Sequence, residues 1–311
     1  MTGTSTWTRT VAYGALVLTA ALWASNGVIA RVLFDSVPPV TLAVLRWMVV
    51  LALLSPVVWP ERRAIGQAIR RDWRMLLPFA VFGSLPQNAL VYTGLARTTA
   101  IHLGLLNSTI PVLILLIGWG FYGLKPRRLE LAGVAVSLAG VMLVLAHGDL
   151  RALARLDFNP GDLVCLAGMV TWAIFTLKLQ QRPQALSLYA FLFTIGLIGQ
   201  LLTLPALALE LGTAGDVRLG TGVLLGILYM GALPTLAAML LYGFAVQRVG
   251  AVQAGIFTHF MPVFTAVFAA TFIGERLFPY HALGFVLVAG GAVMSCLRQV
   301  PVLSSRPSAA S

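Results

Sequence analysis

Polar side chains that could bind a small solute interrupt several long apolar stretches of this sequence. In the first stretch Trp23 and Asn26 are three residues apart, so a helix would place them on one face. Asn26 could then hydrogen-bond to polar groups of a bound molecule, with Trp23 as an aromatic wall. Asn side chains also hold helices together in membranes. Substrate binding and helix packing both stay open for this pair.

The triplet Pro86-Gln87-Asn88 is the most polar one within any apolar stretch. Pro86 removes a backbone hydrogen bond, and interrupted helices mark the substrate sites of many transporters. Gln87 and Asn88 are adjacent and would point in different directions, so we expect at most one of them to line a cavity. Pro234 occupies the comparable place later in the chain, and Tyr229 precedes it by about one turn.

Two further polar groups stand at matching distances before a proline. Asn107 lies four residues before Pro111, and Thr258 lies four residues before Pro262, with His259 next to it. The matched spacing predicts that these polar residues lie near the middle of the membrane. His259 could bind a substrate or a proton, or it could bond between helices as a neutral imidazole.

Arg46 is the only charged residue set well inside an apolar stretch. It could pair with a substrate carboxylate, extend its guanidinium to the membrane surface, or bind backbone carbonyls. All ten Asp and Glu residues fall in loops or at the ends of stretches, so none is placed to bind protons or sodium. We therefore expect no coupling through a buried acid, no metal site and no cofactor. Structural or gating roles are assigned to Arg46 and to four prolines, Pro86, Pro111, Pro234 and Pro262.

The composition is that of a membrane protein. Hydrophobic residues make up 59% of the chain and charged residues 10%, against about 25% charged residues in soluble proteins. The net charge of +11 does not indicate nucleic-acid binding, because the basic residues cluster in short segments between apolar stretches. We expect the lipid bilayer and a small-molecule substrate as partners, and no nucleic acid.

The apolar stretches predict an all-α protein with ten transmembrane helices. They are too long and too uniformly apolar to be barrel strands. We read the first as an uncleaved helix and not as a signal peptide, because its apolar pattern continues to Leu33. The spans are placed near residues 11–33, 39–59, 75–95, 100–123, 129–147, 160–181, 184–209, 220–246, 250–273 and 279–298.

The basic residues predict the orientation. With a cytoplasmic N-terminus, 14 Lys and Arg residues fall in cytoplasmic segments and 6 in external ones. This bias favours cytoplasmic N- and C-termini. The segment 61–74 is either a basic helix along the cytoplasmic surface or a loop that sets the topology.

The chain contains an internal duplication. Glycines follow Pro111 and Pro262 at the same intervals of 12, 22 and 29 residues, and Tyr92 and Tyr242 precede these prolines by 19 and 20. The glycines are Gly123, Gly133 and Gly140 in the first copy and Gly274, Gly284 and Gly291 in the second. We expect them to pack helices four, five, nine and ten within each half.

The duplication divides the chain into two five-helix repeats, residues 11–147 and 160–298, with a periplasmic linker 148–159 and a cytoplasmic tail 299–311. Five is an odd number, so the second repeat enters the membrane inverted, and the substrate site is expected between the repeats near the midplane. Since one chain holds both repeats, a monomer could suffice.

The sequence resembles the drug/metabolite transporter superfamily, specifically its EamA-domain branch, over about residues 12–298. The resemblance rests on Leu22-Trp23-Ala24-Ser25-Asn26, on Gly161-Asp162-Leu163 leading to Thr171-Trp172-Ala173, and on Gly274-Glu275. In the first half Gly123-Leu124 replaces the Gly-Glu of the family. The resemblance implies a secondary transporter, and it is closest to bacterial exporters of aromatic or neutral amino acids.

We therefore expect an exporter of small metabolites that works by alternating access, with Trp23, Trp172 and Tyr92 around a central pocket. The alternatives are an exporter of drugs or toxic cations from the same superfamily, or a channel-like facilitator. An enzyme is not expected, because the chain has no His-Glu-x-x-His site, no Gly-x-Ser-x-Gly elbow and no Walker A loop.

The topology predicts the behaviour of fused reporters. A green fluorescent protein fused to the C-terminus should fluoresce in the cytoplasm, whereas alkaline phosphatase at the same place should be inactive because it needs an oxidising compartment. An active C-terminal phosphatase would contradict the orientation, and a phosphatase fused after residue 152 is the positive control.

Overall fold

The computed structural model describes residues 6–98, 103, 106–146, 160–213, 217–268, 271 and 278–296, and every regular element within them is helical. The first half contains α1 (Thr6–Leu33), α2 (Pro39–Val58), the short η1 (Trp59–Glu61), α3 (Arg62–Arg71), α4 (Trp73–Gly83), α5 (Leu85–Leu95), α7 (Ile110–Tyr122) and α8 (Arg128–Leu145). The second half contains α9 (Pro160–Leu179), α10 (Leu188–Thr213), α11 (Thr221–Met230), η3 (Gly231–Ala237), α12 (Ala238–Val249), α13 (Ala251–Ile256), η4 (Phe257–His259), α14 (Phe260–Phe268) and α15 (Pro279–Cys296).

Six helical stretches of the described residues are long and apolar enough to cross a membrane. They are Thr8–Leu33, Pro39–Arg71, Trp73–Leu95, Pro160–Leu179, Leu188–Thr213 and Thr221–Val249. The other four expected spans contain α7, α8, α13 with α14, and α15. The all-helical membrane fold is as predicted, and the number of ten spans stays a prediction.

The third expected span is broken in the middle. α4 ends at Gly83, Ser84 leaves the helical conformation with φ −125° and ψ −139°, and α5 starts at Leu85. Pro86 therefore lies in the first turn of α5, where its missing N–H costs no hydrogen bond. The Ser84 hydroxyl donates to the Ala80 carbonyl at 2.5 Å and to the Ile195 carbonyl at 3.2 Å.

The corresponding helix of the second half is also irregular. Pro234 lies inside η3, a π-helical segment between α11 and α12, and the Thr235 hydroxyl donates to the Met230 carbonyl at 2.7 Å. π-helical turns inside α-helices are frequent at functional sites. Both halves thus interrupt the same helix.

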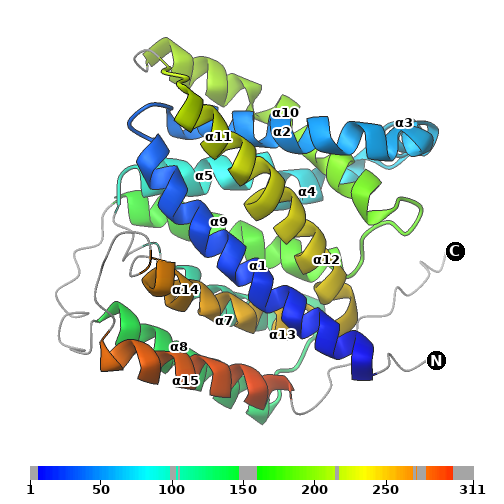
Figure 1. The fold of residues 1–311 in the computed structure, drawn as a ribbon. Coiled ribbons are helices and arrows are strands. Elements are labelled where there is room, and N and C mark those ends of the chain that lie inside the picture. The colour runs from blue at the N-terminus through cyan, green and yellow to red at the C-terminus, as the bar shows by residue number, and fades with distance from the viewer. Residues whose placement is uncertain are drawn as a thin grey trace, which may run out of the picture.

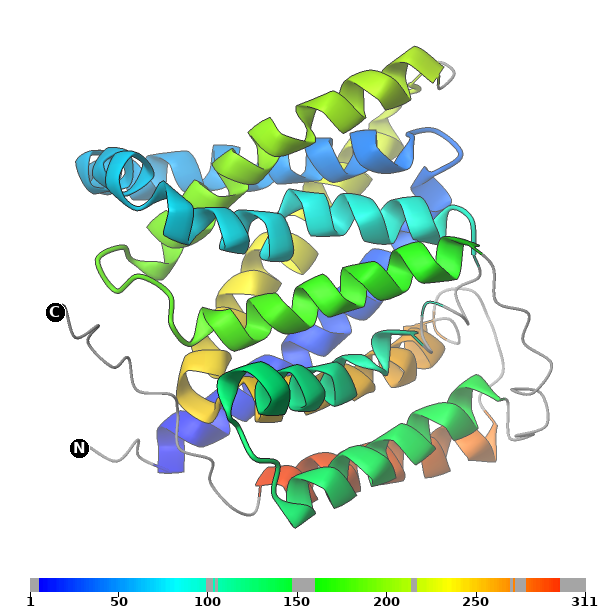
Figure 2. The same ribbon diagram turned by 180° about the vertical axis from the view of Figure 1, so that it is seen from behind.

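Helices that correspond in the two halves pack against corresponding partners. α1 packs against α12 and α14 (Figure 1), and its counterpart α9 packs against α5 and α7 (Figure 2). The two counterpart pairs α8 with α15 and α2 with α10 are also among the largest contacts. This is the pattern of a two-fold axis between two inverted copies.

Two glutamates hold α2 and α10 together at their opposite ends. The Glu210 carboxylate accepts the backbone N–H groups of Val40 at 2.9 Å and Thr41 at 2.7 Å. The Glu61 carboxylate accepts the backbone N–H of Ser187 at 3.1 Å and its hydroxyl at 2.6 Å. Each acid caps the positive N-terminus of the other helix, and the two acids are 149 residues apart, as are Trp23 and Trp172.

Four of the repeated glycines, Gly133, Gly140, Gly284 and Gly291, lie where α8 and α15 meet, so the expectation that they pack helices within each half is wrong. Gly123 ends α7, and Gly274 lies outside the described residues. A Cβ atom on Gly140 would lie 2.8 Å from the Gly284 carbonyl oxygen, and one on Gly291 would collide with the Gly133 carbonyl. The Ser137 hydroxyl donates to the Val288 carbonyl at 3.2 Å. Because of the two-fold axis, the counterpart helices α8 and α15 run antiparallel. Gly140 therefore faces Gly284, and Gly291 faces Gly133.

Most of the basic segment 61–74 forms a helix, α3, and its place along the cytoplasmic surface stays a prediction. Ile65 and Ala68 are buried, and the arginines Arg62, Arg63, Arg70 and Arg71 are exposed. Trp59 and Trp73, just before and after the helix, are exposed as well. Such a basic helix with flanking tryptophans suits a membrane interface.

The glycine contact predicts opposite effects of two neighbouring substitutions. Gly291→Ala should lower the stability by roughly 1–3 kcal/mol, because its Cβ has no room against α8. Gly290→Ala is the matched control: a Cβ there meets nothing within 4 Å, and alanine favours the helix by about 1 kcal/mol. Thermal unfolding in detergent measures both, and equal effects would contradict the contact.

Candidate functional site

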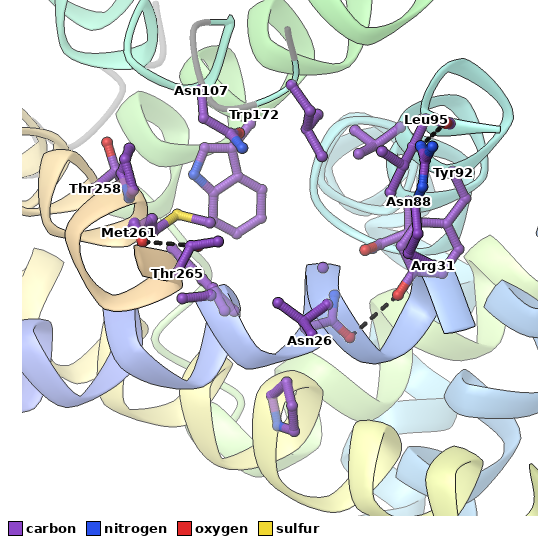
Figure 3. Close-up of a pocket in the computed structure, with 18 of the residues that line it drawn as sticks. Asn26, Arg31, Asn88, Tyr92, Leu95, Asn107, Trp172, Thr258, Met261 and Thr265 are labelled. Atoms are coloured by element: carbon purple, nitrogen blue, oxygen red, sulfur yellow. Dashed lines mark hydrogen bonds between the residues drawn. The ribbon is translucent and has the colours of Figure 1, made fainter. Parts of the chain in front are cut away.

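A cavity of about 590 Å³ lies between the two halves. Its wall is built mainly from the second half of α1, from α5, α9 and η3, and from the segment around α14 (Figure 3). The volume falls within the range of about 300–1,000 Å³ that is usual for small-molecule sites. The cavity therefore has the place and the size expected of a substrate site.

Most of the residues chosen from the sequence line this cavity. The lining includes Trp23, Asn26, Gln87, Asn88, Tyr92, Asn107, Trp172 and Thr258, together with Arg46, Pro234 and Pro262. Tyr229, His259 and Pro111 do not belong to it. Pro86 is in the first turn of α5, and its side chain lies outside the described part of the structure.

Gln87 and Asn88 both line the cavity, so the expectation that at most one would do so is wrong. The Gln87 amide reaches towards α9 and donates to the Gly168 carbonyl at 3.4 Å. Asn88 faces α2, where its Oδ1 accepts a hydrogen bond from Arg46. The cavity borders α5 on the side of α9 and on the side of α2, so both neighbouring side chains belong to its wall.

Arg46 is the centre of a polar cluster. Its side chain is only 2% exposed, and its Nη1 donates to Asn26 Oδ1 at 3.0 Å and to the Tyr92 hydroxyl at 2.6 Å. Its Nη2 donates to Asn88 Oδ1 at 2.6 Å, and the Tyr92 hydroxyl donates to Asn26 Oδ1 at 3.1 Å. The guanidinium is buried and does not extend to the surface of the protein, and it binds no backbone carbonyl of the described residues. These were two of the three alternatives.

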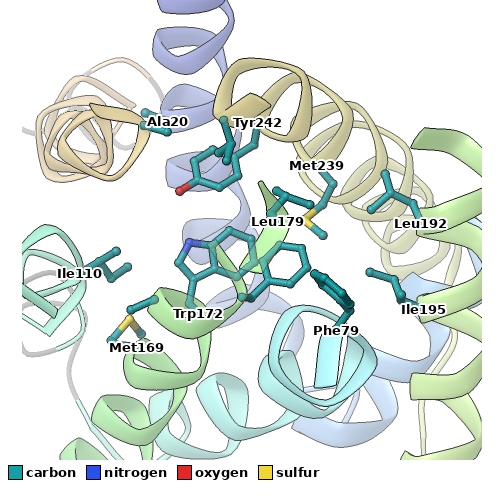
Figure 4. Packing of buried hydrophobic residues seen from close by; sticks show 14 of the residues in the cluster. Ala20, Phe79, Ile110, Met169, Trp172, Leu179, Leu192, Ile195, Met239 and Tyr242 are labelled. Carbon is teal, nitrogen blue, oxygen red and sulfur yellow. The ribbon is translucent and has the colours of Figure 1, made fainter. Parts of the chain in front are cut away.

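Aromatic rings form the opposite part of the wall. Trp23 meets Trp172 edge to face, with the ring centroids 5.1 Å apart, and both contact Tyr242. Figure 4 shows Trp172 and Tyr242 among the buried apolar side chains. The Tyr242 hydroxyl lies 3.2 Å from the Thr176 hydroxyl. The cavity thus combines a polar wall at Arg46 with an apolar one at the tryptophans.

His259 joins the two halves outside the cavity. It is fully buried, and its Nε2 lies 3.0 Å from the Ser108 carbonyl. This is the helix-to-helix bond that was one of the readings of the sequence. Tyr229 likewise serves packing, because its hydroxyl lies 2.8 Å from that of Ser25, and Pro111 is buried in the first turn of α7.

Several lining residues were missed from the sequence. Arg31 lines the cavity and donates through Nη1 to the Thr98 carbonyl at 2.9 Å. Met261 and Thr265 line it opposite Asn26 (Figure 3). Helical spacing predicts these positions, because it places them on the same helix face as residues already chosen. Arg31 follows Trp23 by eight residues, and Met261 and Thr265 follow Thr258 by three and seven.

The EamA-like transporter family matches residues 10–146 and 159–297 of the chain. The chain belongs to this family. The two matched segments together span nearly all of the helical part of this transporter, one in each half.

Its relatives are transporters too. It is 25% identical over 290 residues to an uncharacterized transporter of Archaeoglobus fulgidus, covering 91% of this chain and 96% of the relative. It is 24% identical over 283 residues to a probable terminal-alkyne amino-acid exporter of Streptantibioticus cattleyicolor, covering 90% and 91%. A solved crystal structure superimposes with a TM-score of 0.72 at 18% identity over 94% of this chain and 98% of that one, a likeness of fold.

The cavity of this transporter reaches one end of the helix bundle. Arg31 and Val32, near the end of α1, line it and are exposed. In the other direction the Trp23–Trp172–Tyr242 cluster ends the cavity. Beyond that cluster the Tyr13 hydroxyl donates to Gln253 Oε1 at 3.1 Å, and its ring stacks on Phe257 with centroids 5.6 Å apart.

The shape of the cavity predicts which positions of α1 are accessible. In a chain without native cysteines, Val28→Cys should react with a membrane-impermeant maleimide added at the face that the C-terminal end of α1 reaches. Ala20→Cys is the control, because Ala20 is 2% exposed and lies beyond the aromatic cluster. Labelling of position 20 with protection of position 28 would contradict the observed opening.

Proposed function

We propose that this transporter exports small metabolites, with amino acids of aromatic or neutral side chain as its substrates, by alternating access. The observation that carries the proposal is the cavity between the halves, with hydrogen-bonding groups around Arg46 and the rings of Trp23 and Trp172 on another side. A polar head and an apolar side chain fit such a pocket. The printed name of one relative, an amino-acid exporter, agrees with this substrate class.

We place the transporter in a bacterial inner membrane, with ten spans and both termini in the cytoplasm. The positive charges support this orientation. The open end of the cavity then faces the periplasm, and the aromatic cluster closes the cytoplasmic side. Export requires the reverse state, in which the bonds of Tyr13 to α13 and η4 separate and the periplasmic end closes.

Two alternatives fit the cavity less well. An exporter of toxic cations needs a counter-charge, and the lining drawn from the described residues contains Arg31 and Arg46 but no Asp or Glu. A channel-like facilitator needs a continuous path, and the cluster of Trp23, Trp172 and Tyr242 interrupts it. Both halves of the site come from one chain, so we propose that a monomer transports.

Transport in liposomes tests the proposal. The purified protein should give saturable uptake of radiolabelled phenylalanine that unlabelled phenylalanine competes away. Asn26→Ala should raise the KM about tenfold, the effect of losing one hydrogen bond to a charged or polar group of the substrate. Leu18→Ala is the control, because Leu18 is on α1 but 51% exposed.

Flux that does not saturate would favour the facilitator, and absence of flux with any amino acid would contradict the proposed substrate class. In cells, overexpression should raise the tolerance to toxic analogues such as 4-fluorophenylalanine, and Asn26→Ala should remove most of this protection.

A further inference from the structure

The Arg46 guanidinium is buried beside the cavity with only neutral partners. It has five N–H donors, and three hydrogen bonds to Asn26, Tyr92 and Asn88 occupy three of them. Its Nε has no partner among the described residues. Two donors are thus left on a side chain that is 2% exposed and belongs to the cavity wall.

The positive charge of Arg46 also lacks an opposite charge. Its hydrogen-bond acceptors are amide and hydroxyl oxygens, and the described lining adds a second cation, Arg31, and no carboxylate. Burying an unpaired charge in a membrane costs free energy, so such charges usually face a partner or a functional cavity. An anionic group of a ligand in the cavity would supply the missing negative charge.

The second half of the chain shows that the fold does not need this arginine. Pro56 and Pro205, both inside long helices, are 149 residues apart, as are Glu61 and Glu210, so α2 and α10 correspond residue by residue. This places Ile195, which is fully buried, at the position of Arg46.

Two of the three partners of Arg46 are replaced in the same way, whereas Tyr92 has another tyrosine, Tyr242, as its counterpart. With the spacing of Trp23 and Trp172, Asn26 corresponds to Phe175, and with the spacing of Tyr92 and Tyr242, Asn88 corresponds to Ala238. Phe175 is 1% exposed and Ala238 fully buried. The same helix packing is therefore made once with apolar residues and once with a charged cluster, and the charged cluster is the one that lines the cavity.

We infer that Arg46 binds the carboxylate of the substrate, and that the cavity selects small apolar carboxylates as a class. The free Nε–H and Nη2–H donors suit a carboxylate, and the apolar remainder of the substrate faces Trp172 and Met261. The described lining holds no carboxylate that could pair with an ammonium group, so we expect the amino group of an amino acid to add less than its carboxylate. The inference rests on the proposed function only in taking this cavity as the substrate site.

Three phenyl compounds test whether the carboxylate or the amino group of a ligand determines binding. Each is added to the purified wild-type protein in detergent, and the midpoint of thermal unfolding is followed against concentration. 3-Phenylpropionate should stabilise the protein at concentrations at least about tenfold lower than its neutral amide. 2-Phenylethylamine, which keeps the amino group and lacks the carboxylate, should not stabilise it. Equal effects of the acid and the amine, or no effect of the acid, would overturn the inference.

Substitution of Arg46 tests whether this residue causes the preference for the acid over the neutral amide. Arg46→Gln should bring the acid and the amide within about twofold of each other, since both then meet neutral donors, and Arg46→Lys should restore part of the preference. Arg70→Gln is the control, because it removes the same charge from the exposed face of α3. A purely structural Arg46 would lower the stability and leave the preference for the acid unchanged, which would contradict the inference.

The proposed function and this inference can fail separately. Stabilisation by 3-phenylpropionate without phenylalanine flux in liposomes would contradict the function alone. Phenylalanine flux that 2-phenylethylamine inhibits as well as 3-phenylpropionate does would contradict the inference alone. An anionic lipid headgroup could offer the same chemistry: if phosphatidylglycerol competes with 3-phenylpropionate, the occupant is a lipid and the small-solute assignment is wrong.

Discussion

The contact of counterpart helices at the two-fold axis constrains the rest of this transporter. α8 can approach α15 closely only because glycines remove side chains at the crossing points, where a Cβ would strike the opposite backbone. α2 and α10 meet in the same antiparallel manner, with Trp47 packed against Gly196, its own counterpart 149 residues later. α2 borders α5 and η3, and α8 and α15 border α14, so these contacts position elements that line the cavity. The small residues of the repeat therefore shape the site without touching it.

The sequence predicts the helical fold and the repeat well, for a physical reason. A membrane requires long apolar helices, and duplication leaves prolines, glycines and aromatic residues at equal intervals. It also predicts most of the polar residues in the lining, because a polar side chain in such a helix needs a partner or a cavity. Asn26, Asn88 and Asn107 stand out on this ground alone.

What the sequence does not give is the partner of each residue. Arg46 and Asn88 are 42 residues apart, and only the fold brings them within 2.6 Å. His259 has the chemistry of a site residue but bonds to Ser108 outside the cavity. The glycines were placed within the halves because intervals along a chain carry no information on which helix crosses which. Gln87 and Asn88 are adjacent in the sequence, and both reach the wall because the cavity borders α5 towards α9 and towards α2.

The two glutamate caps also limit how the protein can move. The carboxylates of Glu61 and Glu210 bind α10 and α2 at opposite ends of the pair. If one helix moved along the other by one turn, both carboxylates would lose their hydrogen bonds to the backbone N–H groups. Sliding of a transport domain through a fixed scaffold, as in an elevator, is therefore disfavoured for this pair. A tilt about its centre, where Trp47 meets Gly196, stretches each cap only slightly. In the proposed alternating-access cycle, the α2–α10 pair would therefore be the pivot between the two halves.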